Sequence, residues 1–252
     1  MMGLMVPGTG WAEKNPYVAN AVHFDGAATY LTRGGGLTGA VDSKLLTGSF
    51  WFKSNIDGTT KQIVTNSATL SGGTSYFNFR SPADNRMTLV GFNSSNSLIL
   101  TLHSSANSNK VSNGWVHYVV SVDMANTSKR HVYINDVSDL AIAGPYTDDV
   151  LDLTRPDWSV GARCAGQDKV DGDLADVMLW PGVYVDLSVA SNRRLFIDAG
   201  GKPVDPDVSI AILGTPAIAL RNPTSTWHSN QGSGGGFSEH GTLADATTSP
   251  SD

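Results

Sequence analysis

The residues best suited to hold a cation are three aspartates that lie close together in the sequence. They are Asp168, Asp171 and Asp173, and the backbone carbonyls between them add further oxygen atoms. Calcium prefers such hard oxygen ligands and takes about six to eight of them. The spacing does not follow the EF-hand pattern, so calcium is predicted here only from the residue types and their proximity.

The same stretch holds the best pair of carboxylates for acid–base catalysis. Asp171 and Asp173 alternate, which would place both on one face of a strand. A retaining glycoside hydrolase needs two such carboxyl groups, about 5–5.5 Å apart. The surrounding DKVDGD sequence is more typical of a loop, because Gly and Asp favour turns. A glycan-cleaving enzyme is therefore the alternative hypothesis.

Other catalytic motifs do not occur in the sequence. Only two of the 23 acidic residues are glutamates, Glu13 and Glu239, and neither lies in the ExDxxE pattern of β-glucanases. No G-x-S-x-G motif is found. The lone Cys164 has no motif that would activate it and no second cysteine for a disulfide or a Cys-based zinc site. We predict a protein without catalytic residues.

Aromatic and asparagine residues form a candidate carbohydrate site. The rings of Tyr76, Tyr146 and Trp158 could stack on sugar rings. The amides of Asn96 and Asn109 lie in Asn-rich loops and could hydrogen-bond to sugar hydroxyls. For Trp158 a position in the core is the stronger interpretation, whereas for Tyr146, next to a Gly-Pro turn, the two interpretations are balanced.

These side chains must be positioned by β-strands. Residues 115–122 alternate apolar and polar side chains, and residues 131–135 form a second β-prone run after a polar turn at 123–129. We interpret the pair as an antiparallel hairpin at the centre of a sandwich. Further short strands are expected at 21–32, 48–53, 63–64, 76–79, 87–92, 98–102, 158–161 and 172–180. This pattern predicts an all-β, two-sheet antiparallel jelly-roll sandwich.

The ends of the chain differ from this pattern. Residues 1–20 are irregular and are predicted to form an N-terminal arm anchored by Trp11. One short helix is expected near 188–198, at the end of a sandwich domain that spans 21–203. The extension at 204–252 contains candidate strands at 217–221 and 236–241. Its last residues, TTSPSD, are predicted to be flexible or bound to a partner.

Charge and composition exclude several classes of partner. The net charge is −6, only 16% of the residues are charged, and no block of basic residues occurs, which argues against nucleic acid and anionic membranes. No run of 18 apolar residues is present, so no membrane insertion is expected. Residues 1–10 do not resemble a signal peptide, and we expect synthesis in a host cytoplasm.

Six segments, taken in order, resemble the concanavalin A-like lectin/glucanase superfamily, in its laminin G-like jelly-roll branch. They are HFDGAATYLT (23–32), SFWFK (49–53), GWVHYVVSVD (114–123), RHVYIND (130–136), WSVGA (158–162) and DGDLADVMLWPG (171–182). The resemblance covers residues 20–200. It implies two stacked antiparallel sheets, one of them concave, and it includes relatives that bind sugars or calcium.

The C-terminal part resembles extensions on tailed-bacteriophage or gene-transfer-agent particle proteins. The matching stretches are NRRLFIDAGGKPVD (192–205), GSGGGF (232–237) and SPSD (249–252). The resemblance implies a non-enzymatic virion component, either capsid decoration or tail-associated, that contacts host surface carbohydrate. Its partners would be other virion proteins and further copies of itself. Besides the hydrolase, a structural cement protein without a glycan ligand is the remaining alternative.

Overall fold

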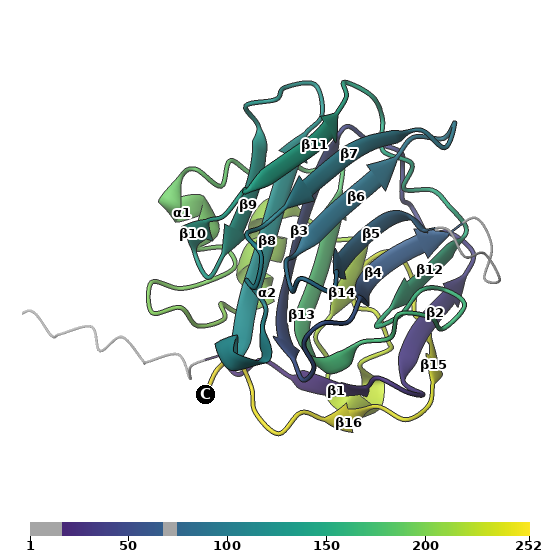
Figure 1. Cartoon of the computed structure of the whole chain (residues 1–252), viewed down its shortest axis with the longest axis vertical. Coiled ribbons are helices and arrows are strands. Elements are labelled where there is room, and N and C mark those ends of the chain that lie inside the picture. The colour runs from purple at the N-terminus through teal and green to yellow at the C-terminus, as the bar shows by residue number, and fades with distance from the viewer. Residues whose placement is uncertain (1–16, 68–74) are drawn as a thin grey trace, which may run out of the picture.

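The computed structural model of the chain describes residues 17–67 and 75–252. The predicted arm, including Trp11, lies almost entirely outside these residues. The described residues form two eight-stranded antiparallel sheets, which share one large apolar core (Figure 1). The predicted all-β sandwich is thereby confirmed.

The two sheets draw their strands from the whole described chain. Sheet A contains β1 (Ala21–Asp25), β3 (Leu45–Ser54), β8 (Trp115–Asp123), β9 (Arg130–Ile134), β10 (Val137–Ser138), β13 (Asp171–Pro181), β14 (Ile218–Leu220) and β16 (Ala244–Asp245). Sheet B contains β2 (Tyr30–Gly34), β4 (Lys61–Ser67), β5 (Ser75–Ser81), β6 (Thr88–Phe92), β7 (Leu98–His103), β11 (Ile142–Tyr146), β12 (Asp157–Val160) and β15 (Ser238–His240). The order is β10-β9-β8-β3-β13-β1-β16 in sheet A, with β14 also on β13, and β11-β7-β6-β5-β4-β12-β2-β15 in sheet B.

The predicted central hairpin is present as β8 and β9. Its register places Tyr118 opposite Ile134 and Val120 opposite Val132, so both pairs point into the core. The turn is closed by local hydrogen bonds, in which Asp123 N donates to Lys129 O at 2.9 Å. The polar turn residues and the apolar–polar alternation both predict this hairpin, which is why it could be recognised from the sequence.

Aromatic residues from both sheets meet between the layers. Phe50 of sheet A contacts Phe79 of sheet B edge-on at 5.6 Å between ring centroids, and Phe79 in turn contacts Tyr118 at 5.8 Å. Trp158 of β12 lies against Phe77 at 5.6 Å and is completely buried. These rings fill the space between the sheets.

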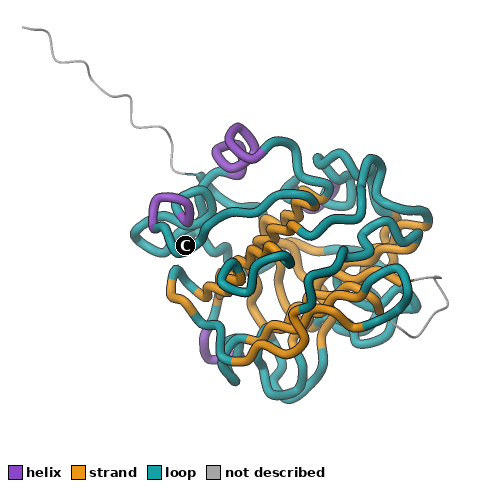
Figure 2. Tube along the Cα trace, turned by 90° about the horizontal axis from the view of Figure 1, so that it is seen from above, coloured by secondary structure: helices purple, strands orange, loops and turns teal. Residues whose placement is uncertain are grey.

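The outer face of sheet A is covered by the segment that follows β13. This covering segment (residues 182–216) contains α1 (Ala190–Arg193) and α2 (Pro206–Leu213), and helical segments lie outside the strand layers in Figure 2. Trp180 of β13 packs against Phe196 at 5.9 Å between centroids, and its indole Nε1 donates to Gly214 O at 2.8 Å. Sheet A is thus buried on both faces.

The helices differ from the prediction. The helix expected near 188–198 is reduced to the four residues of α1, and the longer α2 was not expected. At its start Asp205 accepts a hydrogen bond from Asp207 N, and Pro206 occupies the first turn. Asp before Pro is a helix-start signal, but the neighbouring Gly and Pro residues, which favour turns, obscure it in the sequence.

The strands expected at 217–221 and 236–241 are present as β14 and β15, and β16 follows them. The chain end, which was predicted to be flexible or partner-bound, packs on this chain instead: Ala19 N donates to Ser251 Oγ at 3.0 Å, and Ser249 Oγ donates to Ala19 O at 2.9 Å. Within the described residues, no helix combines the length and apolar character needed to cross a bilayer.

Candidate functional site

The outer face of sheet B carries a row of polar side chains. The register places Gln62 opposite Arg80, Arg80 opposite Thr88, and Thr88 opposite His103. Residues directly opposite one another in antiparallel strands share a face of the sheet. The row therefore crosses β4, β5, β6 and β7 on the side away from the core.

Strand β5 extends this row along the sheet. Tyr76, Asn78 and Arg80 alternate with the core residues Phe77 and Phe79, so all three point outward. Four residues of a strand span about 14 Å, which is the length over which these side chains are spread. We call the resulting surface the polar strip, and its members are Gln62, Tyr76, Asn78, Arg80, Phe92 and His103.

Several polar atoms of the polar strip have no partner among the described residues. They are both side-chain atoms of the Gln62 amide, Oδ1 of Asn78 and Nε of Arg80. Gln62 is 0% exposed and Asn78 3% exposed, so bulk water does not reach their side chains. Leaving a buried polar group unpaired costs about 1–3 kcal/mol, and folded proteins rarely do so without a functional reason. These atoms lie beneath the surface, so the part of the polar strip that a ligand can reach includes the half-buried side chains of Tyr76, Arg80 and His103.

One end of the polar strip is an aromatic and cationic cluster. The Arg155 guanidinium lies 3.6 Å from the centroid of the Tyr76 ring, and Phe92 meets the same ring edge-on at 5.6 Å. Arg155 also donates to Asn96 Oδ1 at 2.7 Å and pairs with Asp152 at 2.9 Å. Tyr76 and Asn96, two of the predicted sugar-site residues, are thus linked through Arg155.

Arg155 itself was not predicted to take part. It precedes β12 by two residues and shares no periodic pattern with Tyr76 or Asn96, which come from β5 and from the β6–β7 turn. No local signal in the sequence could have identified it.

The other three predicted sugar-site residues lie elsewhere. Trp158 is fully buried, and its Nε1 donates to Arg155 O at 3.1 Å, which agrees with the core position that the sequence favoured over stacking on a sugar. The Tyr146 hydroxyl donates to Asp123 O at 2.9 Å, and Arg130 lies 5.5 Å from its ring centroid. Asn109 is buried, with its amide nitrogen 2.9 Å from Met87 Sδ. Tyr146 and Asn109 therefore remain predictions without support from the polar strip.

The three aspartates predicted to bind calcium have separate partners. Asp168 pairs with Arg163 at 2.8 Å, whereas Asp173 contacts His23 at 2.8 Å and Lys53 at 3.3 Å. Within the described ranges, no group of three or more His, Cys, Asp or Glu residues is arranged to hold a metal ion. Asp168, Asp171 and Asp173 thus do not form the predicted calcium site.

Asp173 does border a cavity of about 160 Å³, which also touches His23, Lys53 and Asp245. The carboxylate is only 4% exposed, and each of its oxygens already has a partner. Asp171 lies opposite Asp25 in β1, at the end of the same strand pair. This arrangement holds Asp173 in place by ion pairing and leaves neither of its oxygens free.

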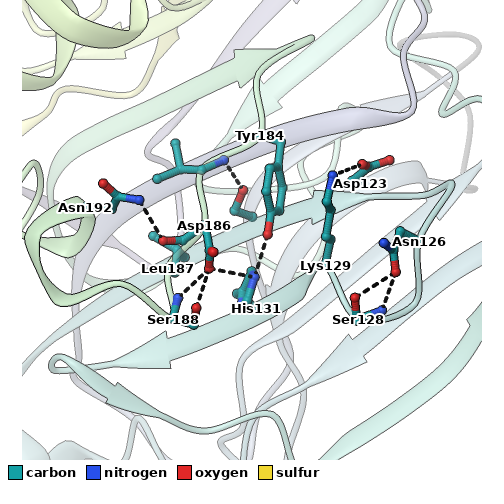
Figure 3. Close-up of polar contacts among 12 residues, drawn as sticks. Asp123, Asn126, Ser128, Lys129, His131, Tyr184, Asp186, Leu187, Ser188 and Asn192 are labelled. Carbon is teal, nitrogen blue, oxygen red and sulfur yellow. Dashed lines mark hydrogen bonds and ion pairs between the residues drawn. The ribbon is translucent and has the colours of Figure 1, made fainter.

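A second polar cluster lies where the covering segment crosses β8 and β9 (Figure 3). Tyr184 has its hydroxyl 2.8 Å from His131 Nε2, and Lys129 Nζ lies 5.1 Å from the centroid of its ring. Asp186 accepts from the backbone and hydroxyl of Ser188 and lies 3.6 Å from His131. Burial lowers the pKa of His131 and outweighs the opposite effect of Asp186. These groups satisfy one another, so the cluster anchors the covering segment and differs from the polar strip.

Comparison with known proteins agrees with this architecture. A family model described as the Concanavalin A-like lectin/glucanases superfamily matches residues 25–190. The chain therefore belongs to this superfamily, as the six sequence segments indicated. No curated protein matches the sequence.

Solved structures resemble this chain to different extents, all at low sequence identity. A protein from Bacteroides ovatus ATCC 8483, to which carbohydrate binding is assigned, superposes with a TM-score of 0.62 at 14% identity, over 92% of this chain. This chain covers 61% of that protein's length. A heptameric SAP-like pentraxin from Limulus polyphemus gives a TM-score of 0.48 at 14% identity, over 68% of this chain and 79% of its own. The CBM40 of a Ruminococcus gnavus IT-sialidase, bound to α2,3 sialyllactose, gives 0.43 at 9% identity, over 62% and 83%.

Proposed function

We propose that this chain is a non-catalytic carbohydrate-binding protein and that the polar strip binds the glycan. The observation that carries the proposal is the half-buried guanidinium of Arg80, which has no ion pair or hydrogen bond among the described residues, on the same outward face as an aromatic cluster. Sugars present hydroxyl groups that both donate and accept, together with apolar ring faces. The polar strip offers the complementary groups over about 14 Å of strand β5.

Each part of the polar strip has a different task in this proposal. The rings of Tyr76 and Phe92 provide apolar surface for a sugar ring, because amphipathic aromatic side chains bury area while keeping a polar edge. The half-buried Arg80 guanidinium donates to hydroxyls, whereas the Gln62 and Asn78 amides lie beneath the surface. Arg155 holds Tyr76 and Asn96 in position through its stacking and its hydrogen bond. Membership in a superfamily that includes lectins, and the fold shared with the Bacteroides ovatus protein, support this assignment.

A glycan array followed by calorimetry tests the proposal. The wild-type chain should bind at least one glycan, and Tyr76→Ala should weaken that binding about tenfold, since one aromatic contact contributes about 1–1.5 kcal/mol. Tyr184→Ala is the matched control, because Tyr184 belongs to the anchoring cluster on sheet A. An empty array, or equal loss in the two variants, would contradict the proposal.

The absence of catalysis is part of the proposal and has its own test. The alternative, a glycoside hydrolase, is favoured by the contact between His23 and Asp173 beside the 160 Å³ cavity. We expect no release of reducing ends from a panel of polysaccharides. Release that is abolished by Asp173→Asn, in a variant that still folds, would establish the enzyme instead.

We further propose that the chain works as a repeated component of a phage-like particle assembled in a host cytoplasm, where many copies raise the avidity of weak sugar contacts. The resemblance of residues 192–205, 232–237 and 249–252 to particle proteins supports this setting. Within residues 192–205, Leu195 and Phe196 pack on sheet A of the same chain, whereas residues 198–202 are exposed, so a contact with a neighbouring copy through this stretch would use the exposed residues. Mass spectrometry and electron microscopy of purified particles should detect the chain in multiple copies, and its absence from particles would refute the setting.

A further inference from the structure

Arg80 differs from the other arginines around it. Arg163 pairs with Asp168 at 2.8 Å, and Arg86 pairs with Asp84 at 2.5 Å. Among the residues that the structure describes, no ion pair or hydrogen bond is found for the Arg80 guanidinium, and its Nε is buried without a partner. The charge of Arg80 is therefore not balanced by a direct contact.

The surroundings of Arg80 add positive rather than negative potential. Burial lowers the pKa of Arg80, the neighbouring Arg163 lowers it further, and Asp168 acts in the opposite direction. His103, in the same cross-strand row, has its pKa lowered by burial and then by Arg86 and Arg80. Because Asp84 pairs with Arg86 and Asp168 pairs with Arg163, neither carboxylate neutralises the positive charge of Arg80 by a direct contact. This excess is local, because the chain as a whole carries a net charge of −6.

Next to Arg80 lies an amide that also lacks partners. Gln62 is directly opposite Arg80 in the register, and its side chain is 0% exposed with both polar atoms unpaired. Its backbone N donates to Asp168 O at 3.0 Å, so the loop between β12 and β13 lies over this end of β4. A half-buried cation next to an unsatisfied amide is costly unless an anion and a hydrogen-bond partner arrive together.

We propose that the Arg80 end of the polar strip binds the acidic group of a charged glycan, a carboxylate or a sulfate. The guanidinium has a planar fork of donors that fits both oxyanions, and the buried Gln62 amide beside it supplies no competing negative charge. This inference rests on the proposed carbohydrate binding and adds the class of ligand. The Tyr76 end then contacts a neighbouring sugar ring, and the Arg80 end selects the charge.

Matched pairs of polysaccharides test this selection. The probes are polygalacturonate, alginate and hyaluronan, each beside its carboxyl-reduced neutral form, together with a sulfated galactan beside the unsulfated one. The wild-type chain should bind an acidic member about tenfold or more tightly than its neutral partner, since a charge-assisted hydrogen bond contributes about 1.5–3 kcal/mol. The carboxylate and sulfate arms identify which oxyanion is bound.

Two variants connect the preference to Arg80. Arg80→Gln should remove the preference for the acidic member while binding of the neutral one persists. Arg130→Gln is the matched control on β9 of sheet A and should keep the preference. If Arg80→Gln fails to fold, Arg80→Lys and the salt dependence of the wild type replace it: the preference should fall in the lysine variant, because an ammonium lacks the planar fork, and it should also fall as ionic strength rises.

Each outcome of the experiment is decisive. Equal or tighter binding of the neutral members, or a preference that survives in Arg80→Gln, would overturn the inference and leave carbohydrate binding intact. Binding to no glycan of any kind would overturn the proposed function as well.

Discussion

The two outer faces of the sandwich differ in how they are completed. The outer face of sheet A carries Val119, Met178 and Trp180, and residues 182–216 of the same chain cover it. The outer face of sheet B carries the polar strip, in which the amide of Gln62 and other buried polar atoms have no partner. Burial of apolar area stabilises the first face, whereas the second keeps unsatisfied groups at a cost in stability. The difference distinguishes a face that supports the fold from a face to which we assign the proposed binding.

The largest effect that would test this contrast is loss of a tryptophan from sheet A. Trp180→Ala should lower the free energy of unfolding by about 3–5 kcal/mol, because it removes a fully buried ring and its bond to Gly214. Phe92→Ala, the aromatic counterpart on sheet B, should cost roughly 1–2 kcal/mol, since its ring is only partly buried. Urea unfolding measures the loss of unfolding free energy in both variants. Equal losses would contradict the difference between the two faces.

A second effect concerns the pH dependence of the sheet A face. Burial raises the pKa of Asp176 to about 7, against smaller opposing effects from the Tyr17 hydrogen bond and Arg221. A carboxyl group whose pKa is raised in the folded state contributes to the free energy of unfolding below about pH 4. This contribution is lost as the pH rises to about 7. Burial lowers the pKa of His117 to about 3. The contribution of His117 to the free energy of unfolding is therefore present above about pH 6.5 and is lost as the pH falls toward about 3.

Asp176→Asn separates these two opposing contributions. Asparagine tolerates the positive φ of 48° at this position and can keep the contact with Tyr17. The variant should gain a few kcal/mol over the wild type at pH 8 and none at pH 4, since about three pKa units of linkage are removed at the higher pH. Unfolding free energies measured between pH 4 and pH 8 check this, and a difference that does not change with pH would contradict the assignment.

The smallest effect compares two polar residues, one on each face. Ser121→Ala on sheet A should lower stability by about 1–2 kcal/mol, because its hydroxyl accepts from Val185 N at 2.8 Å in the buried interface. Gln62→Leu on sheet B should be neutral or stabilising by about 1 kcal/mol, because it removes an unpaired amide. The same Gln62→Leu variant should bind glycan more weakly. A destabilised Gln62→Leu variant with unchanged glycan binding would show that the amide serves the fold.

The strands were predictable because their signal is local. The alternation in residues 115–122 and the turn that follows appear as β8 and β9 with the expected register. The same signal could not separate the two faces of a strand. Trp158 was a candidate for sugar stacking, yet it faces the core, whereas Tyr76, on another strand of the same sheet, faces outward.

The candidate site was only partly predictable. Tyr76 and Asn96 were chosen by residue type, and Arg155 links them, but no periodicity points to that arginine. Arg80 and Gln62 were not chosen at all, because their missing partners depend on every neighbour they have in space. The three aspartates predicted to bind calcium are not grouped, because Asp168 pairs with the nearby Arg163 and Asp173 contacts His23 and Lys53, which lie far away in the sequence.

By itself the sequence determined an all-β sandwich of the concanavalin A-like type, because strand alternation, turn residues and core aromatics act over a few neighbouring positions. Only the tertiary structure decided which sheet is covered and which polar groups remain unpaired. Trp180 contacts Phe196 and Gly214, and Gln62 lies opposite Arg80 in the strand register. These neighbours come from strands and segments that are distant in the chain. Burial and pairing are properties of that assembled surface, and they distinguish the supporting face from the face proposed to bind glycan.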